Sequence, residues 1–332
     1  MRYVYPPACR ACRAGRRVLS LFCIILLLPL SALAAMPDAL VPLGVAAGIR
    51  LPESGVTVAG LASVDGTCPA RDAGLLPGDV LLTANGAPVA SPAALQRAAE
   101  GGSPLTLTVR RGEETLTLQV TPVESADGWR IGVWVRDSML GIGTLTYYNP
   151  ADGSFGALGH GITELGSDRL IPLSGGAIVA ASVPSVQPGA SGAPGELHGS
   201  FDGDRTLGTV EKNTAGGIFG RMAAAPTSGA CVAPAPAHIG EAQILACTEG
   251  ETPALYRVRI LRLRPRDENL RNLVLEVTDE ALLERTGGIV QGMSGSPILQ
   301  DGRLVGAVTH VLVNDPRRGY GISIENMLAE AG

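Results

Sequence analysis

The sequence predicts a mainly β protein with two domains behind an N-terminal export segment. Its 332 residues, 45% of them hydrophobic, suffice for two domains with separate cores. The 44 glycines and 24 prolines indicate many turns, and most apolar runs are short. Helical patterns are confined to about 92–99 and 324–331. Many short strands joined by Gly-rich turns predict a closed or sandwich-like β fold.

Residues 1–34 have the parts of an export signal. An arginine-rich start precedes an apolar run over 18–30, and Ala32-Leu33-Ala34 forms a small-x-small cleavage site. The apolar run is short compared with the roughly twenty residues of a bilayer-spanning helix. We expect either a cleaved signal peptide or an uncleaved anchor that tethers the protein through 18–30. Under either interpretation, the remaining chain is expected to be exported across the cytoplasmic membrane.

The charge balance argues against nucleic-acid partners. The formal net charge is −5, but residues 1–34 hold five of the 26 basic residues and none of the 31 acidic ones. The remaining chain therefore carries a net charge of −10, and Lys212 is its only lysine. A domain this acidic lacks the basic surface that binds phosphate backbones.

The first domain is expected at 41–123. It combines a strand at 56–59, a helix at 92–99 and an alternating strand at 105–110. Between them, residues 73–89 read AGLLPGDVLLTANGAPV, in which Asn85-Gly86 suits a tight hairpin turn. This stretch resembles the signature of PDZ domains, a β-rich fold with a flanking helix.

The PDZ resemblance implies a site for an extended peptide that adds to a sheet edge. The positions that match the carboxylate-receiving loop and strand are Gly48, Ile49, Arg50 and Leu51. They depart from the usual Gly-Leu-Gly-Phe loop, so the alternative is a module that only packs on its neighbour.

The second domain is expected at 126–332, after a polar turn at 124–128. Its clearest motif is Gly292-Met293-Ser294-Gly295-Ser296-Pro297, followed by a strand at 304–309. A serine attacks a carbonyl when a tight turn projects its hydroxyl and backbone N–H groups face the developing oxyanion. Glycines allow such a turn, so Ser294 is the candidate nucleophile. The loop resembles that of chymotrypsin-like serine peptidases.

A serine nucleophile needs a general base, and the sequence contains four histidines that could serve as one. His160 ends an apolar run between two glycines and precedes Ser294 in the chain, as in chymotrypsin-like peptidases. His198 and His238 lie in polar or Pro-rich segments and are expected at the surface. His310 lies in a Val-rich strand and is the rival candidate, although packing is the commoner role of such a histidine.

A third group should orient the histidine. Asp279 ends an alternating strand fifteen positions before Ser294, Asp168 follows His160 by eight, and Asp152 is more distant. Their positions in the sequence leave the choice open.

No cofactor or metal is expected. The exported part keeps three cysteines, Cys68, Cys231 and Cys247, whose spacing fits no zinc motif. A Cys231–Cys247 disulfide is an option, and small unpaired thiols are the other.

Three longer stretches identify the chain as similar to the SpoIVB peptidase family, the stage IV sporulation protein B of spore-forming bacteria. They lie at 130–150, 155–162 (FGALGHGI) and 275–328. The order of export segment, PDZ domain and peptidase is also that of the family. The resemblance implies a chymotrypsin-like β-barrel serine endopeptidase.

Carried over by position, the resemblance gives His160 as general base, Ser294 as nucleophile and Asp279 as the triad carboxylate. Gly292 and Ser294 would supply the oxyanion N–H groups. The expected substrates are the chain itself and a membrane-embedded regulator of a sigma-factor-processing protease. The expected location is the intermembrane space of the sporulating cell, with the PDZ domain controlling self-association or substrate access.

Two alternatives belong to other classes. A catalytically inactive PDZ-containing binding scaffold predicts that Ser294→Ala keeps every function. An esterase would use the same serine, but the strand, GxSxG and helix order of α/β-hydrolases is missing from the sequence.

Overall fold

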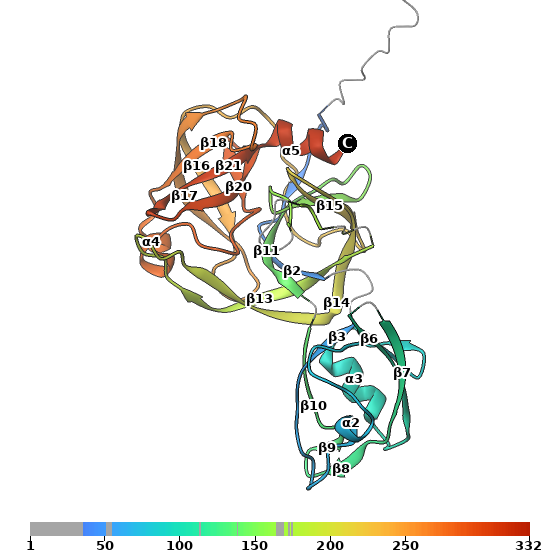
Figure 1. The fold of residues 1–332 in the computed structure, drawn as a ribbon. Helices are drawn as coiled ribbons and strands as arrows, with labels where there is room; N and C mark the ends of the chain where they lie inside the picture. Colours follow the sequence, from blue (N-terminus) through green and yellow to red (C-terminus); the bar gives the residue numbers. More distant parts are fainter. Residues whose placement is uncertain are drawn as a thin grey trace, which may run out of the picture. The chain divides into compact units, whose positions relative to one another are not determined.

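The computed structural model describes residues 36–332 except 51–54, 113, 138, 164–168, 172 and 174. The predictions for the export segment, Leu51 and Asp168 therefore lie outside the described residues. In the part that is described, no helix is long and apolar enough to cross a membrane. Most described strands belong to three antiparallel sheets, two of which close into barrels (Figure 1).

The PDZ-like sheet has the order β10-β3-β4-β6-β7, with β5 added to β4. Its core is apolar, and Leu81, Leu105 and Leu107 are fully buried in it. The elements of this region are β3 (Val56–Leu61), α2 (Pro69–Asp72), β4 (Val80–Ala84), β5 (Ala87–Pro88), α3 (Pro92–Ala99), β6 (Leu105–Arg111), β7 (Glu114–Val120), the hairpin strands β8 (Val123–Ser125) and β9 (Gly128–Arg130), and β10 (Val133–Asp137).

The first barrel follows the path β11-β12-β15-β14-β13-β2 and returns to its start because β2 also pairs with β11; β1 lies on β11 outside the ring. Phe155, Ile178 and Ile218 lie in its core. Its strands are β1 (Val41–Pro42), β2 (Ala46–Arg50), β11 (Met139–Tyr148), β12 (Ser154–Ala157), β13 (Ala177–Gln187), β14 (Glu196–Thr214) and β15 (Gly217–Met222).

The second barrel closes in the order β16-β17-β18-β21-β20-β19. Ile244, Leu275 and Ile298 are fully buried in its core. Its elements are β16 (Gly240–Ala246), β17 (Ala254–Leu263), β18 (Leu273–Val277), α4 (Glu280–Thr286), β19 (Pro297–Gln300), β20 (Arg303–Leu312), β21 (Asp315–Ser323) and α5 (Ile324–Ala331).

Both barrels share one strand order. Numbered along the chain within each barrel, the strands run 1-2-3-6-5-4 around the ring, as β2-β11-β12-β15-β14-β13 and as β16-β17-β18-β21-β20-β19. Two six-stranded antiparallel barrels of the same order confirm the predicted chymotrypsin-like architecture.

The PDZ-like sheet is inserted into the first barrel, because β3 to β10 lie in the chain between barrel strands β2 and β11. This differs from the predicted division into 41–123 and 126–332. Residues 41–50 belong to the first barrel, and β10 belongs to the PDZ-like sheet. The polar turn at 124–128 lies within the β8–β9 hairpin.

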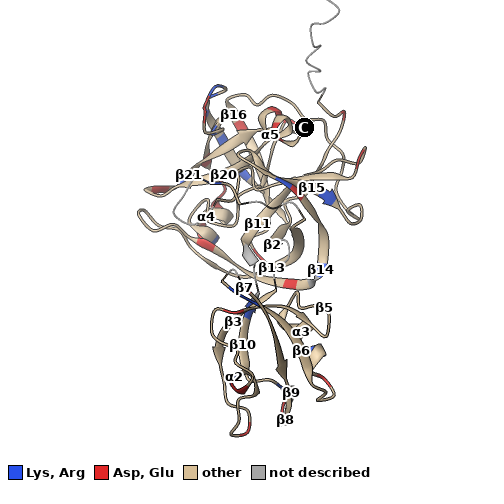
Figure 2. Ribbon diagram, turned by 45° about the vertical axis from the view of Figure 1, so that its right-hand side comes forward, with Lys and Arg blue, Asp and Glu red and all other residues tan. Residues whose placement is uncertain are grey.

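Acidic and basic residues are interspersed along the barrel strands, as Figure 2 shows. Arg259 and Arg318 make cross-strand ion pairs with Glu241 and Glu276. All three described cysteines are free thiols, so the optional Cys231–Cys247 disulfide is not formed.

Candidate functional site

Ser294 lies in the connection between β18 and β19 of the second barrel. After α4, this connection turns sharply at Gly292 and Gly295, whose φ angles are 93° and 97°. A Cβ atom at Gly295 would lie 2.0 Å from the Thr144 carbonyl oxygen and 2.6 Å from the Leu158 nitrogen. Only glycine allows both the dihedral angle and this close approach.

Three hydrogen bonds hold the serine loop against β11 of the first barrel. The Thr144 N–H donates to the Ser294 carbonyl at 2.9 Å. The Thr144 hydroxyl donates to the Gly292 carbonyl at 3.0 Å, and the Thr146 hydroxyl donates to the Gly295 carbonyl at 2.8 Å. Both threonines are buried. The first barrel therefore positions a serine that the second barrel carries.

The Ser294 hydroxyl donates to the Thr309 carbonyl of β20, with an Oγ to O distance of 2.6 Å. In this arrangement its proton is not directed at a histidine. Among the described residues, the backbone N–H groups of Gly292 and Ser294 donate to no protein acceptor. These are the two donors that the family resemblance assigns to an oxyanion hole.

His160 follows β12 in a loop that contacts the second barrel. Leu158 and Gly159 have left-handed φ angles of 67° and 69°. A Cβ at Gly159 would lie 3.0 Å from side-chain carbons of both Thr309 and Ile322. The histidine loop thus lies against β20 and β21, next to the residue that receives the serine hydroxyl.

The hydrogen bond of the His160 ring fixes its tautomer. Nδ1 lies 2.9 Å from the Gly161 carbonyl oxygen. Because a carbonyl only accepts, Nδ1 carries the proton, and in the neutral ring Nε2 keeps the lone pair of a base. Burial lowers the pKa of His160, and the bond to Gly161 offsets part of this effect. The neutral, basic form therefore predominates at neutral pH.

His310 of β20 lies beside His160, with ring centroids 4.9 Å apart and planes tilted by 39°. Burial, and then the charges of His160 and Arg271, lower the pKa of His310 to about 4. Its buried Nδ1 atom has no hydrogen-bond partner among the described residues. The sequence pattern predicted a packed strand histidine or a rival base, and gave no signal that the two rings would be neighbours.

Asp279 is the N-cap of α4. Its carboxylate accepts from the Leu282 and Arg257 N–H groups, each at 3.2 Å, and lies 3.6 Å from the Arg257 Nε atom. Burial would raise the pKa of Asp279, but the backbone bonds from Arg257 and Leu282 and the charge of Arg257 lower it overall.

Among the described residues, no hydrogen bond joins Asp279 to His160. His310, Tyr320 and Val274 form one row across β20, β21 and β18. Asp279 comes five residues after Val274 and two residues beyond the end of β18, where it begins α4. The bonds of the Asp279 carboxylate thus run to the start of α4 and to β17, and the His160 ring bonds to Gly161.

The remaining candidates lie elsewhere. Asp152 sits in the β11–β12 turn, where it accepts from the Ser154 N–H at 2.9 Å. His198 and His238 are exposed, as expected, and His238 pairs with Asp301 at 2.8 Å. Within the described residues, no group of three or more His, Cys, Asp or Glu side chains could hold a metal ion.

The structure places three of the predicted peptide-binding positions of the PDZ domain in the first barrel. Gly48, Ile49 and Arg50 lie in β2, which is paired along both edges, with β11 and with β13. An edge that is already paired on both sides cannot add a peptide strand.

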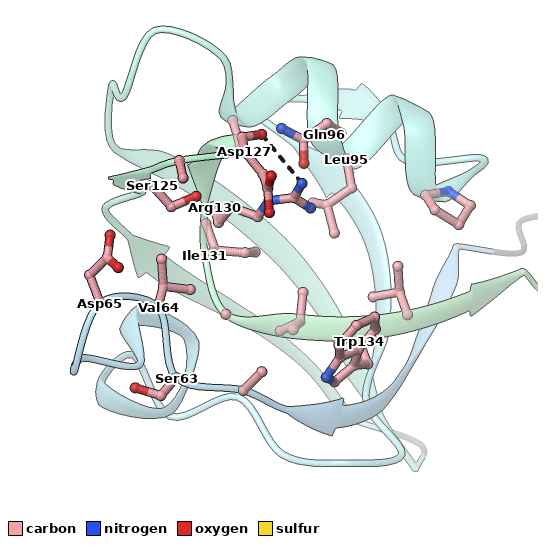
Figure 3. Close-up of a pocket in the computed structure, with 17 residues that line it drawn as sticks. Ser63, Val64, Asp65, Leu95, Gln96, Ser125, Asp127, Arg130, Ile131 and Trp134 are labelled. Atoms are coloured by element: carbon pink, nitrogen blue, oxygen red, sulfur yellow. Dashed lines mark hydrogen bonds between the residues drawn. The ribbon is translucent and has the colours of Figure 1, made fainter.

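The PDZ-like sheet has a free edge at β10, whose partner among the described strands is β3. A groove of about 770 Å³ runs between β10 and α3 (Figure 3). Leu95, Ile131 and Val133 are among the apolar residues that line it, and Trp134 is 70% exposed at its edge.

The loop before β10 reads Arg130-Ile131-Gly132-Val133. Gly132 has a φ of 79°, and a Cβ there would meet the Ala62 carbonyl at 2.6 Å. The N–H groups of Ile131 and Gly132 donate to no protein acceptor in the described part of the chain. Two free donors beside an apolar groove suit a peptide that ends in a carboxylate after an apolar side chain.

Comparisons with known proteins give two family matches. The profile of the SpoIVB peptidase S55 family matches residues 127–328, and that of the PDZ domain matches residues 43–121. None of the curated proteins matches the chain.

Among solved structures, the chain is similar to the Rv3671c protease. The inactive form is 14% identical over 57% of this chain and 83% of that chain, with a TM-score of 0.36. The active form, from M. tuberculosis, is 16% identical over 58% of this chain and 74% of that chain, with a TM-score of 0.32.

Proposed function

The chain belongs to the SpoIVB peptidase S55 family and is a serine peptidase with a PDZ domain, and from this we propose that Ser294 is its nucleophile and His160 its general base. One observation carries the proposal. The Ser294 hydroxyl bonds to Thr309 and the His160 ring packs on the next residue, His310, so both side chains contact β20.

The proposed reaction is endoproteolysis by acyl transfer. Ser294 Oγ attacks the scissile carbonyl while its proton moves to His160 Nε2, and the N–H groups of Gly292 and Ser294 stabilise the oxyanion. His160 then protonates the leaving amine. Water, deprotonated by His160, releases the acyl group.

The resting serine must first change rotamer, because its hydroxyl donates to the Thr309 carbonyl. Rotation of the serine side chain releases the proton from this carbonyl without moving the backbone. We therefore propose that substrate entry breaks the bond to Thr309.

The test uses the purified full-length chain and its Ser294→Ala variant, treated with a fluorophosphonate probe and followed by intact mass. Covalent labelling and self-cleavage in the wild type, both missing in the variant, would support the proposal. A folded wild type that neither labels nor cleaves a peptide mixture would instead support the inactive PDZ-containing scaffold.

The third triad member needs a separate test. The family resemblance gives this role to Asp279, whose carboxylate caps α4. Asparagine is an equally good N-cap, so Asp279→Asn keeps the helix start while removing the charge. Labelling reduced by orders of magnitude at an unchanged melting temperature would support the triad role, which would require Asp279 to move.

For the biological substrate, we propose a membrane-embedded regulator of a sigma-factor-processing protease, cut outside the cytoplasm during sporulation. Family membership supports this role. Incubating the wild type and Ser294→Ala with membranes of sporulating cells and comparing cleaved proteins by mass spectrometry would test it.

A further inference from the structure

Asn213, at the end of β14, binds the loop that carries His160. Its Oδ1 atom accepts from the Ile162 N–H at 3.0 Å. Its Nδ2 group donates to the carbonyls of Ile162 and Ile171, both at 2.8 Å. The side chain is partly buried and makes all three bonds across at least 42 positions of sequence.

These bonds fix the orientation of the amide. Two of its partners are carbonyls, which only accept, and the third is an N–H, which only donates. The NH2 group must therefore face the carbonyls, and Oδ1 must face Ile162. An aspartate could keep the bond to the Ile162 N–H but could not donate to Ile162 and Ile171 when ionised.

One peptide group connects Asn213 to the imidazole. The unit between Gly161 and Ile162 donates its N–H to Asn213 Oδ1 and accepts His160 Nδ1–H at its carbonyl. Hydrogen bonds in such a chain polarise one another, so a bond at the N–H strengthens the carbonyl as an acceptor.

We propose that Asn213 is a positioning residue that orients His160 and strengthens its Nδ1 hydrogen bond through the Gly161–Ile162 peptide group. The inference rests on the proposed role of His160 as general base. We call the hydrogen-bonded chain from Asn213 through the Gly161–Ile162 peptide group to His160 the relay. In the resting structure, the relay orients the imidazole as a carboxylate does in a Ser-His-Asp triad.

A measurement on the unmodified protein tests the tautomer. In ¹⁵N NMR of the full-length wild type, the neutral His160 ring should show a protonated Nδ1 and an unprotonated Nε2, with assignment by comparison with His160→Gln. The opposite tautomer would overturn the proposal whether or not any Asn213 variant folds.

Kinetics test the relay. Asn213→Ala should lower kcat for a peptide substrate by about 10²-fold, the scale of a misplaced catalytic group, while KM changes little. The acid limb of the pH profile should move to lower pH, because the imidazolium loses stabilisation. Asn213→Asp keeps only the bond to the Ile162 N–H, so its acid limb should stay closer to that of the wild type than the limb of Asn213→Ala does. Equal pH profiles of kcat in Asn213→Ala and Asn213→Asp would overturn the proposal.

Asn272 offers a matched control in the second barrel. Its side chain also makes three bonds, to Arg264, Ser323 and Asn326. Asn272→Ala should lower stability but leave the pH profile unchanged.

If the wild type fails to label with fluorophosphonate, the proposed function fails. If the wild type and Asn213→Ala label at equal rates, only the relay fails.

Discussion

At the scale of single residues, the paired imidazoles of His160 and His310 govern how the site responds to pH. Burial lowers the pKa of both rings, and a charge on His160 lowers that of His310 further. Two cations at this distance inside protein would repel strongly. Both rings are therefore neutral around pH 7, which leaves His160 ready to take a proton.

The activity of Ser294 should persist into mild acid. Because burial depresses the pKa of His160, the neutral base survives below the ordinary histidine value of about 6.5. The rate of fluorophosphonate inactivation, measured between pH 4 and 8, should therefore reach half its maximum below pH 6.5. A midpoint at or above 6.5 would contradict the buried environment of this ring.

Several residues of the site could be predicted from the sequence because short motifs carry them. Ser294 and His160 sit in Gly-flanked loops, and the structure places both at the junction of the barrels. Thr144, Thr146 and Asn213 lie on long strands, and no local motif distinguishes them. Their roles arise from partners more than 40 positions away.

At the scale of elements, local signals predicted two of the four described helices and several single strands, and missed α2 and α4. The helices expected at 92–99 and 324–331 have those bounds in α3 and α5, each capped by a serine side chain. The alternating strand expected before Asp279 is β18, although it ends two residues earlier, at Val277. Caps and alternation act within a few residues, which makes them visible in the sequence.

Strand partners could not be predicted in the same way. Gly48–Arg50 and Ile131–Val135 are both short apolar runs with a glycine, and both fit the edge of a PDZ sheet. The structure assigns the first to the barrel and the second to the groove. Periodicity tells which face of a strand is buried and not which sheet the strand joins.

The turn of the serine loop gives a prediction for Gly295. Gly295→Ala should destabilise the protein by several kcal/mol and abolish labelling of Ser294, since the new Cβ would overlap the Thr144 carbonyl. Gly302 is the matched control, with a φ of 72° but no atom within 4 Å of its Cβ position. Gly302→Ala should cost only about 1–2 kcal/mol of dihedral strain. Chemical denaturation compares the two, and equal losses would contradict the steric argument.

The free edge of β10 gives a prediction for peptide binding. A peptide with an apolar last residue and a free carboxylate should change the fluorescence of Trp134, which is exposed beside the groove. Its C-terminal amide should bind about ten-fold or more weakly, because hydrogen bonds to a charged group contribute about 1.5–3 kcal/mol. The signal should vanish in Trp134→Phe. Equal affinities of acid and amide would argue against carboxylate capture by Ile131 and Gly132.

At the scale of the whole molecule, two barrels of the same strand order carry the catalytic candidates, and the PDZ-like sheet interrupts the first barrel. All elements from β3 to β10 lie between β2 and β11 in the chain, yet β2 and β11 are paired neighbours in the first barrel. β11 also carries Thr144 and Thr146, which hold the serine loop. In the chain, only residue 138 lies between β10, the free edge of the PDZ-like sheet, and β11.

The register of these two strands shows how the insertion can be removed. Arg50 pairs with Met139, so the strands approach each other where the PDZ-like region leaves and rejoins the barrel. Residues 51–138 can therefore be replaced by an Asn-Gly turn, the usual link of a two-residue hairpin. Since the PDZ-like sheet has its own core, the shortened protein should keep both barrel cores intact.

We expect this shortened variant to unfold cooperatively and to label at Ser294 with fluorophosphonate, because Thr144, Asn213 and His160 all stay in the first barrel. Circular dichroism melting and intact mass would measure both properties. Loss of labelling in a protein that still melts cooperatively would mean that the inserted domain itself completes the active arrangement. An unfolded product would contradict the assignment of β2 and β11 as hairpin neighbours, since that pairing is all that the new turn requires.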